Sequence, residues 1–122
     1  MNNQSAKADA GKLQLTLVPL EMIEDVAVIR GFGNMKYKDP DNWKTVEKER
    51  YRDAMFRHLL AYLRNPGGVD SESGLPHLWH MMCNGAFLCS LETADGTLPT
   101  AQDALARMKI PDQKPERRGI YG

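Results

Sequence analysis

Three polar side chains interrupt an otherwise apolar segment, LPHLWHMMCNGAFLCSL, at residues 75–91. His77, His80 and Asn84 are spaced by three and four residues, which places them on one face of an α-helix. Imidazoles bind divalent transition metals and exchange protons near neutral pH. On a buried face, an unpaired imidazole or amide would cost about 1–3 kcal/mol. This face therefore predicts either a metal or catalytic site or a satisfied hydrogen-bond network between helices.

A further histidine, His58, lies on the apolar face of the preceding segment. The helical stripe on that face comprises Tyr51, Met55, His58 and Tyr62. A short turn around Pro66 separates the two segments, so the expected helices should be antiparallel neighbours. We expect His58 to face His77 and His80.

Two pairs of carboxylates could supply oxygen ligands for magnesium or manganese. Glu21 and Glu24 form an ExxE pair on one helical face, and Asp70 and Glu72 precede the apolar segment. A solvated polar face is the alternative interpretation of the first pair. Capping of free backbone amides is the alternative for the second.

A basic and aromatic cluster follows the first expected helix. Lys36 could meet phosphate charge, while Tyr37 or Trp43 could stack on a nucleobase, although simple anchoring of the loop would use the same residues. Gly31 and Gly33 follow a helix rather than a strand, so neither a dinucleotide fingerprint nor a P-loop is indicated.

The composition limits the classes of function. The 122 residues carry 16 basic and 16 acidic side chains, which argues against a nucleic-acid polymer or an anionic membrane as partner. No apolar run is long enough to span a bilayer, and the start lacks the apolar core of a secretory signal. Cys83 and Cys89 lie six residues apart in one helix and cannot bridge each other. We expect a cytoplasmic protein.

These residues require a set of helices to position them. The chain is expected to be all-α: a small bundle around a central apolar helix, in a single domain at residues 13–110 between tails at 1–12 and 111–122. Hydrophobic spacing and breaker residues predict an extended segment at 13–17, helices at 19–30, 45–64 and 75–91, and a last short helix starting with a Thr100–Asp103 capping box. Gly31 and Gly33 are expected to end the first of these helices.

The order of the motifs resembles a known family. The stretches LVPLEMIEDVAVIRGFGNMKY, DNW, RDAMFRHLLAYLRN and VDSESGLPHLWHMMCNGAFLCSLE occur in this order over residues 12–92. Their most specific part combines an Arg57-His58 pair with DxESG and HxxHxxxN. This pattern resembles the dATP/dGTP diphosphohydrolase N-terminal domain family of phages, which is distantly similar to the MazG-like all-α nucleotide pyrophosphohydrolases. This chain has ExxE at residues 21–24, but HxxH replaces the later ExxD of the MazG-like enzymes.

The resemblance implies a metal-dependent hydrolase that converts purine deoxynucleoside triphosphates to monophosphate and pyrophosphate in phage nucleotide metabolism. The protein would then act in the host cytoplasm. Its cofactor would be Mg²⁺ or Mn²⁺, or alternatively Zn²⁺. The implied catalytic residues are His58, His77, His80 and Asn84, and the implied metal ligands are His77, His80, Glu21, Glu24, Asp70 and Glu72. Lys36, Tyr37 and Trp43 would bind the substrate, and a homo-oligomer is expected to complete the cleft.

A non-enzymatic module is the competing hypothesis. In that case the same helices would bind a nucleotide or a host protein without turnover.

Overall fold

The computed structural model describes residues 11–108 and divides the chain into two compact units. The larger unit is Gln14–Pro99. The other comprises Met1–Leu13 and Thr100–Gly122, of which the structure describes residues 11–13 and 100–108. Residues 1–10 of the first expected tail and the whole of the second, 111–122, therefore fall outside the described residues.

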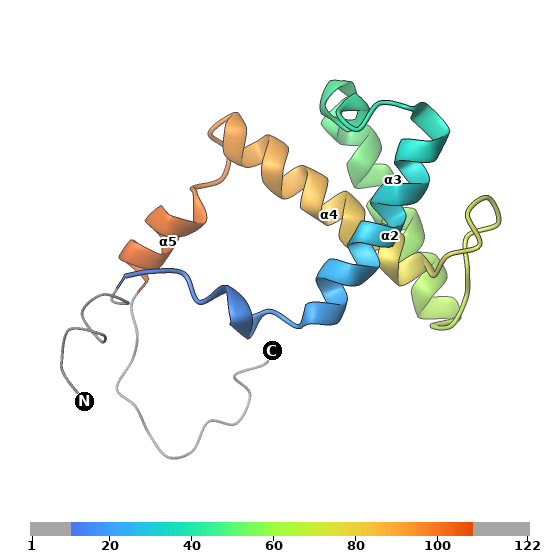
Figure 1. The fold of residues 1–122 in the computed structure, drawn as a ribbon, viewed down its shortest axis with the longest axis horizontal. Helices are drawn as coiled ribbons and strands as arrows, with labels where there is room; N and C mark the ends of the chain where they lie inside the picture. The colour runs from blue at the N-terminus through green and yellow to red at the C-terminus, as the bar shows by residue number, and fades with distance from the viewer. Residues whose placement is uncertain (1–10, 109–122) are drawn as a thin grey trace, which may run out of the picture. The chain divides into compact units, whose positions relative to one another are not determined.

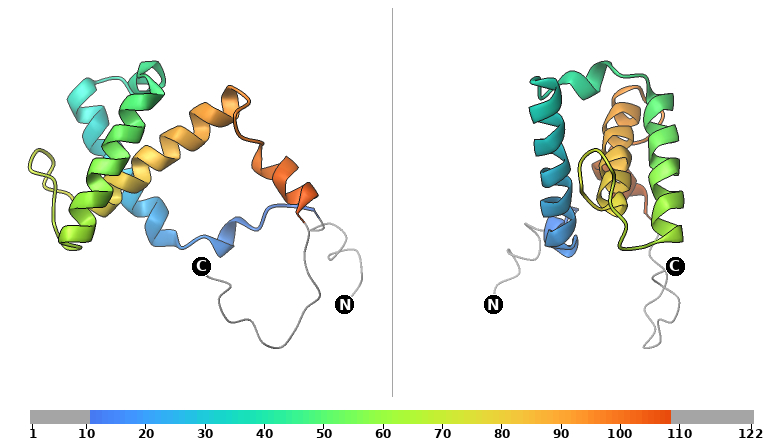
Figure 2. Two further views of the ribbon diagram at one scale, coloured as in Figure 1. Left: turned by 180° about the vertical axis from the view of Figure 1, so that it is seen from behind. Right: turned by 90° about the vertical axis from the view of Figure 1, so that its right-hand side faces the viewer.

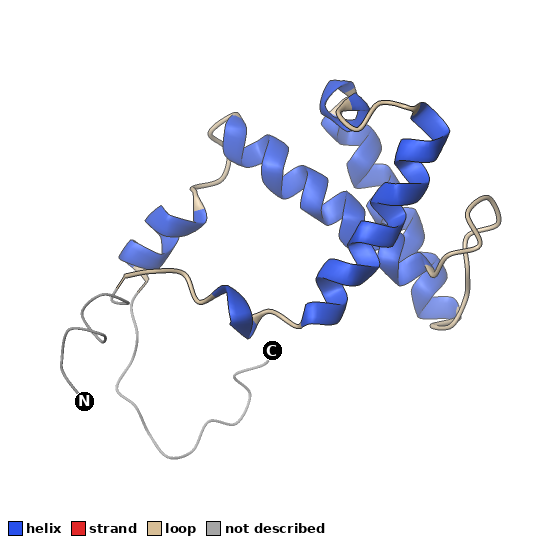
Figure 3. Cartoon of the chain, in the orientation of Figure 1, coloured by secondary structure: helices blue, strands red, loops and turns tan. Residues whose placement is uncertain are grey.

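The described chain is helical, as the sequence predicts (Figures 1 and 3). The larger unit contains three long helices, α2 (Leu20–Tyr37), α3 (Lys48–Arg64) and α4 (His77–Ala94), with short 3₁₀ turns η1 (Leu15–Leu17) and η2 (Asn42–Thr45). Between residues 11 and 108, β-pairing is limited to one isolated bridge that joins Val69 to Pro76. None of the helices in this range is long and apolar enough to cross a membrane.

The first long helix differs from its prediction. Gly31 and Gly33 were expected to end it, but α2 continues through both to Tyr37. Helical glycine costs roughly 1 kcal/mol relative to alanine, and packing of α2 against α4 outweighs that local preference. Lys38 ends the helix instead, in the left-handed conformation (φ 59°) with its N–H bonded to the carbonyl of Asn34.

The extended segment predicted at residues 13–17 is also wrong. Leu15–Leu17 form a 3₁₀ turn, in which the Val18 N–H donates to the Leu15 carbonyl at 3.2 Å. Alternating leucines favour a strand only where a neighbouring strand can pair with them, and the part of the chain that the structure describes offers none here.

The next two helices lie close to their predicted positions. α3 starts at Lys48 rather than Thr45, because Thr45 belongs to η2 and its hydroxyl donates to the Asn42 carbonyl at 2.8 Å. α3 ends at Arg64 as expected. α4 begins two residues later than expected, after Pro76 as its N-cap, and continues to Ala94.

α4 lies between α2 and α3 and packs against both, as the right-hand view of Figure 2 shows. The predicted inward stripe of α3 is confirmed, because its four members are all partly buried: Tyr51, Met55, His58 and Tyr62. The buried side chains of α4 are Cys83, Asn84 and Leu88.

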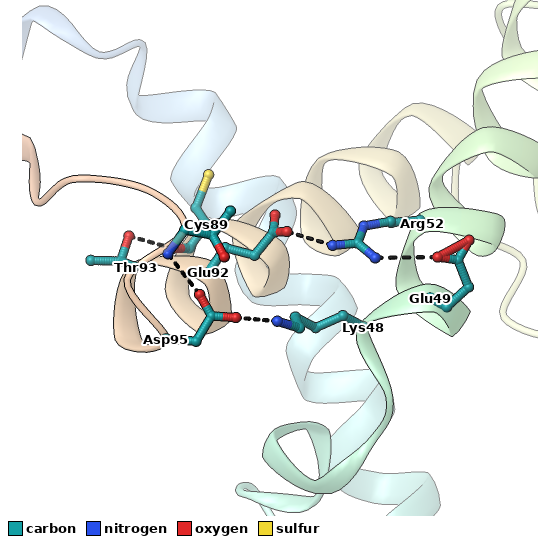
Figure 4. A network of polar contacts seen from close by, with 8 residues as sticks. Lys48, Glu49, Arg52, Cys89, Glu92, Thr93 and Asp95 are labelled. Carbon is teal, nitrogen blue, oxygen red and sulfur yellow. Dashed lines mark hydrogen bonds and ion pairs between the residues drawn. The ribbon is translucent and has the colours of Figure 1, made fainter.

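Ion pairs join the beginning of α3 to the end of α4 (Figure 4). Lys48 pairs with Asp95, and Arg52 joins Glu92 on α4 to Glu49 on its own helix. The hydrogen bond from Lys48 is the main cause that holds the pKa of Asp95 below its usual value. These contacts add to the packing between α3 and α4.

In the smaller unit, α5 (Ala101–Arg107) begins where the capping box predicts it. The Thr100 hydroxyl accepts a hydrogen bond from the Asp103 N–H at 3.1 Å.

Candidate functional site

A cleft of about 1080 Å³ opens between α2, η2, α3, the loop after α3, and α4. α4 contributes His80, Asn84 and Phe87 to its lining, and the loop contributes Asp70 and Glu72. The inward faces that the sequence predicts for α3 and α4 therefore both border this cleft.

The three histidines form a single cluster. His58 Nδ1 lies 2.8 Å from His77 Nδ1, so one ring donates and the other accepts. The His58 ring stacks on that of His80, with centroids 4.6 Å apart and an angle of 11° between the ring planes. The expectation that His58 faces the histidines of α4 is confirmed.

Asp70 completes a group that could hold a metal ion. One ligand atom from each of His58, Asp70 and His77 lies within 4.8 Å of the others. Asp70 is held in place because its Oδ2 accepts hydrogen bonds from the backbone N–H groups of Ser73 at 2.9 Å and Glu72 at 3.0 Å. It thus caps the loop, while Pro76 occupies the N-cap of α4.

The protonation states suit metal ligands. Burial is the main cause that lowers the pKa of His58 to about 4, and the nearby His80 and His77 lower it further. Burial likewise lowers the pKa of His80. Burial would raise the pKa of Asp70, but the N–H groups of Ser73 and Glu72 and the nearby His80 together hold it below its usual value. At neutral pH His58 and His80 are therefore neutral, and Asp70 is ionised.

The His80 ring also forms a hydrogen bond. The Ser73 hydroxyl lies 2.7 Å from His80 Nε2, and it also accepts a hydrogen bond from the Leu75 N–H at 3.1 Å. The hydroxyl orients the imidazole beside the group that could hold a metal ion. Ser73 is the serine of the DxESG pattern, and the sequence alone indicates no role for it.

Asn84 is buried at 9% exposure and lines the cleft. Its amide nitrogen donates to the His80 carbonyl on its own helix, at 2.9 Å. The side chain is therefore satisfied without a ligand, although it still borders the cleft.

The candidate phosphate-binding residue, Lys36, forms an ion pair with the candidate ligand Glu72. Lys36 Nζ lies 2.8 Å from both carboxylate oxygens of Glu72, 36 residues away in the chain. The hydrogen bond to Glu72 is the main cause that raises the pKa of Lys36. Both residues line the cleft, beside the histidine and aspartate group.

The other end of the cleft is aromatic. The Trp43 and Phe87 rings stack with centroids 4.7 Å apart, and the Tyr51 ring lies 4.9 Å from Phe87. The Tyr51 hydroxyl donates to the Trp43 carbonyl at 2.6 Å, and burial raises the pKa of Tyr51. The Arg30 guanidinium carbon lies 5.2 Å from the centre of the Phe87 ring.

Sequence reasoning proposed Trp43 and Tyr37 for this region, and both line the cleft. The sequence did not indicate a role in the site for Arg30, Tyr51 or Phe87, although it predicted that Tyr51 belongs to an inward-facing stripe. Their only sequence signal is that each lies on the helix face that also carries other cleft residues.

The ExxE pair lies elsewhere. Glu21 and Glu24 are exposed in the first turns of α2 and do not belong to the cleft lining. Seven other proposed site residues lie together in the structure: Lys36, His58, Asp70, Glu72, His77, His80 and Asn84. Glu21 and Glu24, which were expected to be metal ligands, do not join them.

Cys83 faces the cleft from a buried position and is a free thiol, as is the exposed Cys89. Burial raises the pKa of Cys83 to about 11. It is therefore protonated at neutral pH, which argues against its use as a nucleophile.

Residues 2–100 match the family described as "dATP/dGTP diphosphohydrolase, N-terminal". The chain belongs to this family. The match covers α2, α3, α4 and the whole cleft between them.

A curated protein of Salmonella phage PMBT28, named "dATP/dGTP diphosphohydrolase", is 31% identical to this chain over 114 residues. The alignment covers 93% of this chain but 38% of the phage protein, so the chain spans about two fifths of that relative's length. No solved structure is similar enough to count as a match.

Proposed function

We propose that the cleft binds a purine deoxynucleoside triphosphate with a divalent metal ion and hydrolyses it to the monophosphate and pyrophosphate. One observation carries the proposal: a single cleft joins His58 and Asp70, two members of the group that could hold a metal ion, to an aromatic and basic end. The printed names of the family and of the phage relative supply the substrate.

The residues present fit a metal ion. His58, Asp70 and His77 offer two imidazole nitrogens and one carboxylate oxygen, and Glu72, two residues after Asp70, would be a further oxygen ligand. This donor set favours Mn²⁺ or Zn²⁺ over Mg²⁺, which prefers oxygen ligands throughout. A bound ion would neutralise phosphate charge and lower the pKa of a water molecule.

The chain's own residues would do the rest. Lys36 would leave Glu72 and bind phosphate oxygens, because a polyphosphate carries more charge than one carboxylate. His80 would accept the proton of the attacking water, since it is neutral and oriented by Ser73. The water oxygen would bond to the α-phosphorus, and the bond from that phosphorus to the bridging oxygen would break to release pyrophosphate.

The direct test is product analysis with purified protein. With Mn²⁺, dATP and dGTP should yield monophosphate and pyrophosphate, while His80→Ala should lose at least about 100-fold in kcat, the usual contribution of a general base. Asp41→Asn is the matched control, because Asp41 is exposed, pairs with Lys44 and lies outside the cleft lining. Absence of turnover with Mn²⁺, Mg²⁺, Zn²⁺ and Co²⁺ would refute the enzymatic proposal.

The coverage of the phage relative favours a second candidate, a nucleotide-binding module without turnover. The activity named for that protein would then belong to the part of its length that this chain does not match. A rise in melting temperature with nucleotide and metal, without any product, would support this candidate.

The expected homo-oligomer stays a proposal. Phe56, Leu60 and Leu63 form an exposed apolar stripe at helical spacing on α3, which supports an interaction surface there. Light scattering during size-exclusion chromatography would measure the subunit number.

A further inference from the structure

Arg30 lies at the aromatic end of the cleft and is held there from two sides. Its terminal nitrogen Nη2 donates to the Pro40 carbonyl at 2.6 Å, and its guanidinium lies over the Phe87 ring. Trp43 stacks on the same ring. The arginine is partly buried and lines the cleft.

The guanidinium retains capacity to bind a ligand. Arginine has five N–H donors and no acceptor. Among residues 11–108 the structure records one hydrogen bond from this side chain, to Pro40. The remaining donors suit a group that offers acceptors only.

The spacing along α4 relates this end to the phosphate end. His80 and Phe87 are seven residues apart on the same helix and both line the cleft. At 1.5 Å per residue, this separation is about 10 Å along the helix axis. A nucleotide with its phosphates near His80 and Lys36 would extend its base toward Phe87 and Arg30.

We propose that Arg30 selects purines by donating a hydrogen bond to N7 of the base, an inference that rests on the proposed nucleotide substrate. Adenine and guanine share the N7 acceptor, and pyrimidines lack it. Guanine adds O6 as a second acceptor, whereas adenine presents an amino donor at the same position. Arg30 therefore binds guanine through two acceptors and adenine through one, and guanine nucleotides bind more tightly.

The test uses deoxynucleoside monophosphates, which bind without being hydrolysed, so that it does not depend on turnover. Calorimetry compares dGMP and dAMP with their 7-deaza analogues, in which a C–H group replaces N7. The wild-type protein should bind 7-deaza-dGMP about 5- to 100-fold more weakly than dGMP, the range of a good arginine–guanine contact.

Two variants assign this difference to the arginine. Arg30→Met keeps an unbranched side chain against Phe87 but has no donor, so it should bind dGMP and 7-deaza-dGMP equally. Arg30→Lys keeps one charged donor group and should retain part of the difference. Arg52→Met is the matched control, because Arg52 pairs with Glu92 and Glu49 outside the cleft (Figure 4).

Three results would overturn the inference. Equal wild-type affinity for dGMP and 7-deaza-dGMP would show that N7 is not bound, and this comparison needs no variant to fold. A difference that persists in Arg30→Met would assign N7 to another group. Either result leaves the proposed hydrolysis intact, whereas failure to bind any monophosphate or triphosphate would refute both proposals.

Discussion

His58 makes the stability of the protein depend on pH. Its pKa of about 4 lies below the ordinary 6.5, so between these values the unfolded chain takes up a proton that the folded chain excludes. The contribution of His58 to the free energy of unfolding should therefore be largest above pH 6.5, fall as the pH falls toward 4, and level off below that. His80 acts in the same direction, because burial lowers its pKa too.

The size of the effect follows from the gap between the two pKa values. That gap corresponds to about 3 kcal/mol, with each pKa unit worth about 1.4 kcal/mol. Because His58 is only partly buried, solvent screening reduces this contribution, and we expect a loss of about 1–2 kcal/mol.

Urea unfolding at intervals from pH 7.5 to 4.5, in the presence of EDTA, would measure this dependence. His58→Phe removes the titrating group but keeps an aromatic ring against His80, so its stability should change less steeply between pH 6.5 and 4.5. Tyr62→Phe, on the same stripe of α3, should retain the wild-type slope. Parallel curves for wild type and His58→Phe would refute a neutral, partly buried His58.

Three further changes test the site and its surroundings. Asp70→Asn should weaken Mn²⁺ binding at least about tenfold by calorimetry, because an anionic ligand is lost, while Asp41→Asn should not change it. Asn84→Leu should lower the free energy of unfolding by about 1 kcal/mol in urea titrations, since a buried hydrogen bond is removed; an unchanged midpoint would contradict this. Iodoacetamide at pH 8 should alkylate Cys89 and spare Cys83 in mass spectra of the folded protein, and equal labelling would contradict the buried, high-pKa thiol.

The contact between the histidines could be predicted from the sequence because the helix face on which each histidine lies depends on local spacing. His77 and His80 share a face of one helix, and His58 lies on the inward stripe of the preceding helix. A short connection between two amphipathic helices leaves few other ways to bury both faces.

The extent of α2 could not be predicted in this way. Gly31 and Gly33 have a local preference against helix, and the sequence around them contains no sign of the packing against α4 that overrides it. The consequence reaches the site, because the extra turns carry Lys36 and Tyr37 to the wall of the cleft.

The sequence by itself determined the helical class, the approximate limits of α3 and α4, the cap of α5, and the grouping of the histidines. The helix limits and the cap depend on residues within a few turns of one another, and the grouping of the histidines depends also on the short connection between α3 and α4. Tertiary structure decided which carboxylates join them: Asp70 does so because backbone N–H groups of its loop hold it toward His58 and His77, while Glu21 and Glu24 stay exposed. It also decided the pairing of Lys36 with Glu72 and the place of Arg30 beside Phe87, because such contacts depend on how separate helices pack rather than on spacing along one helix.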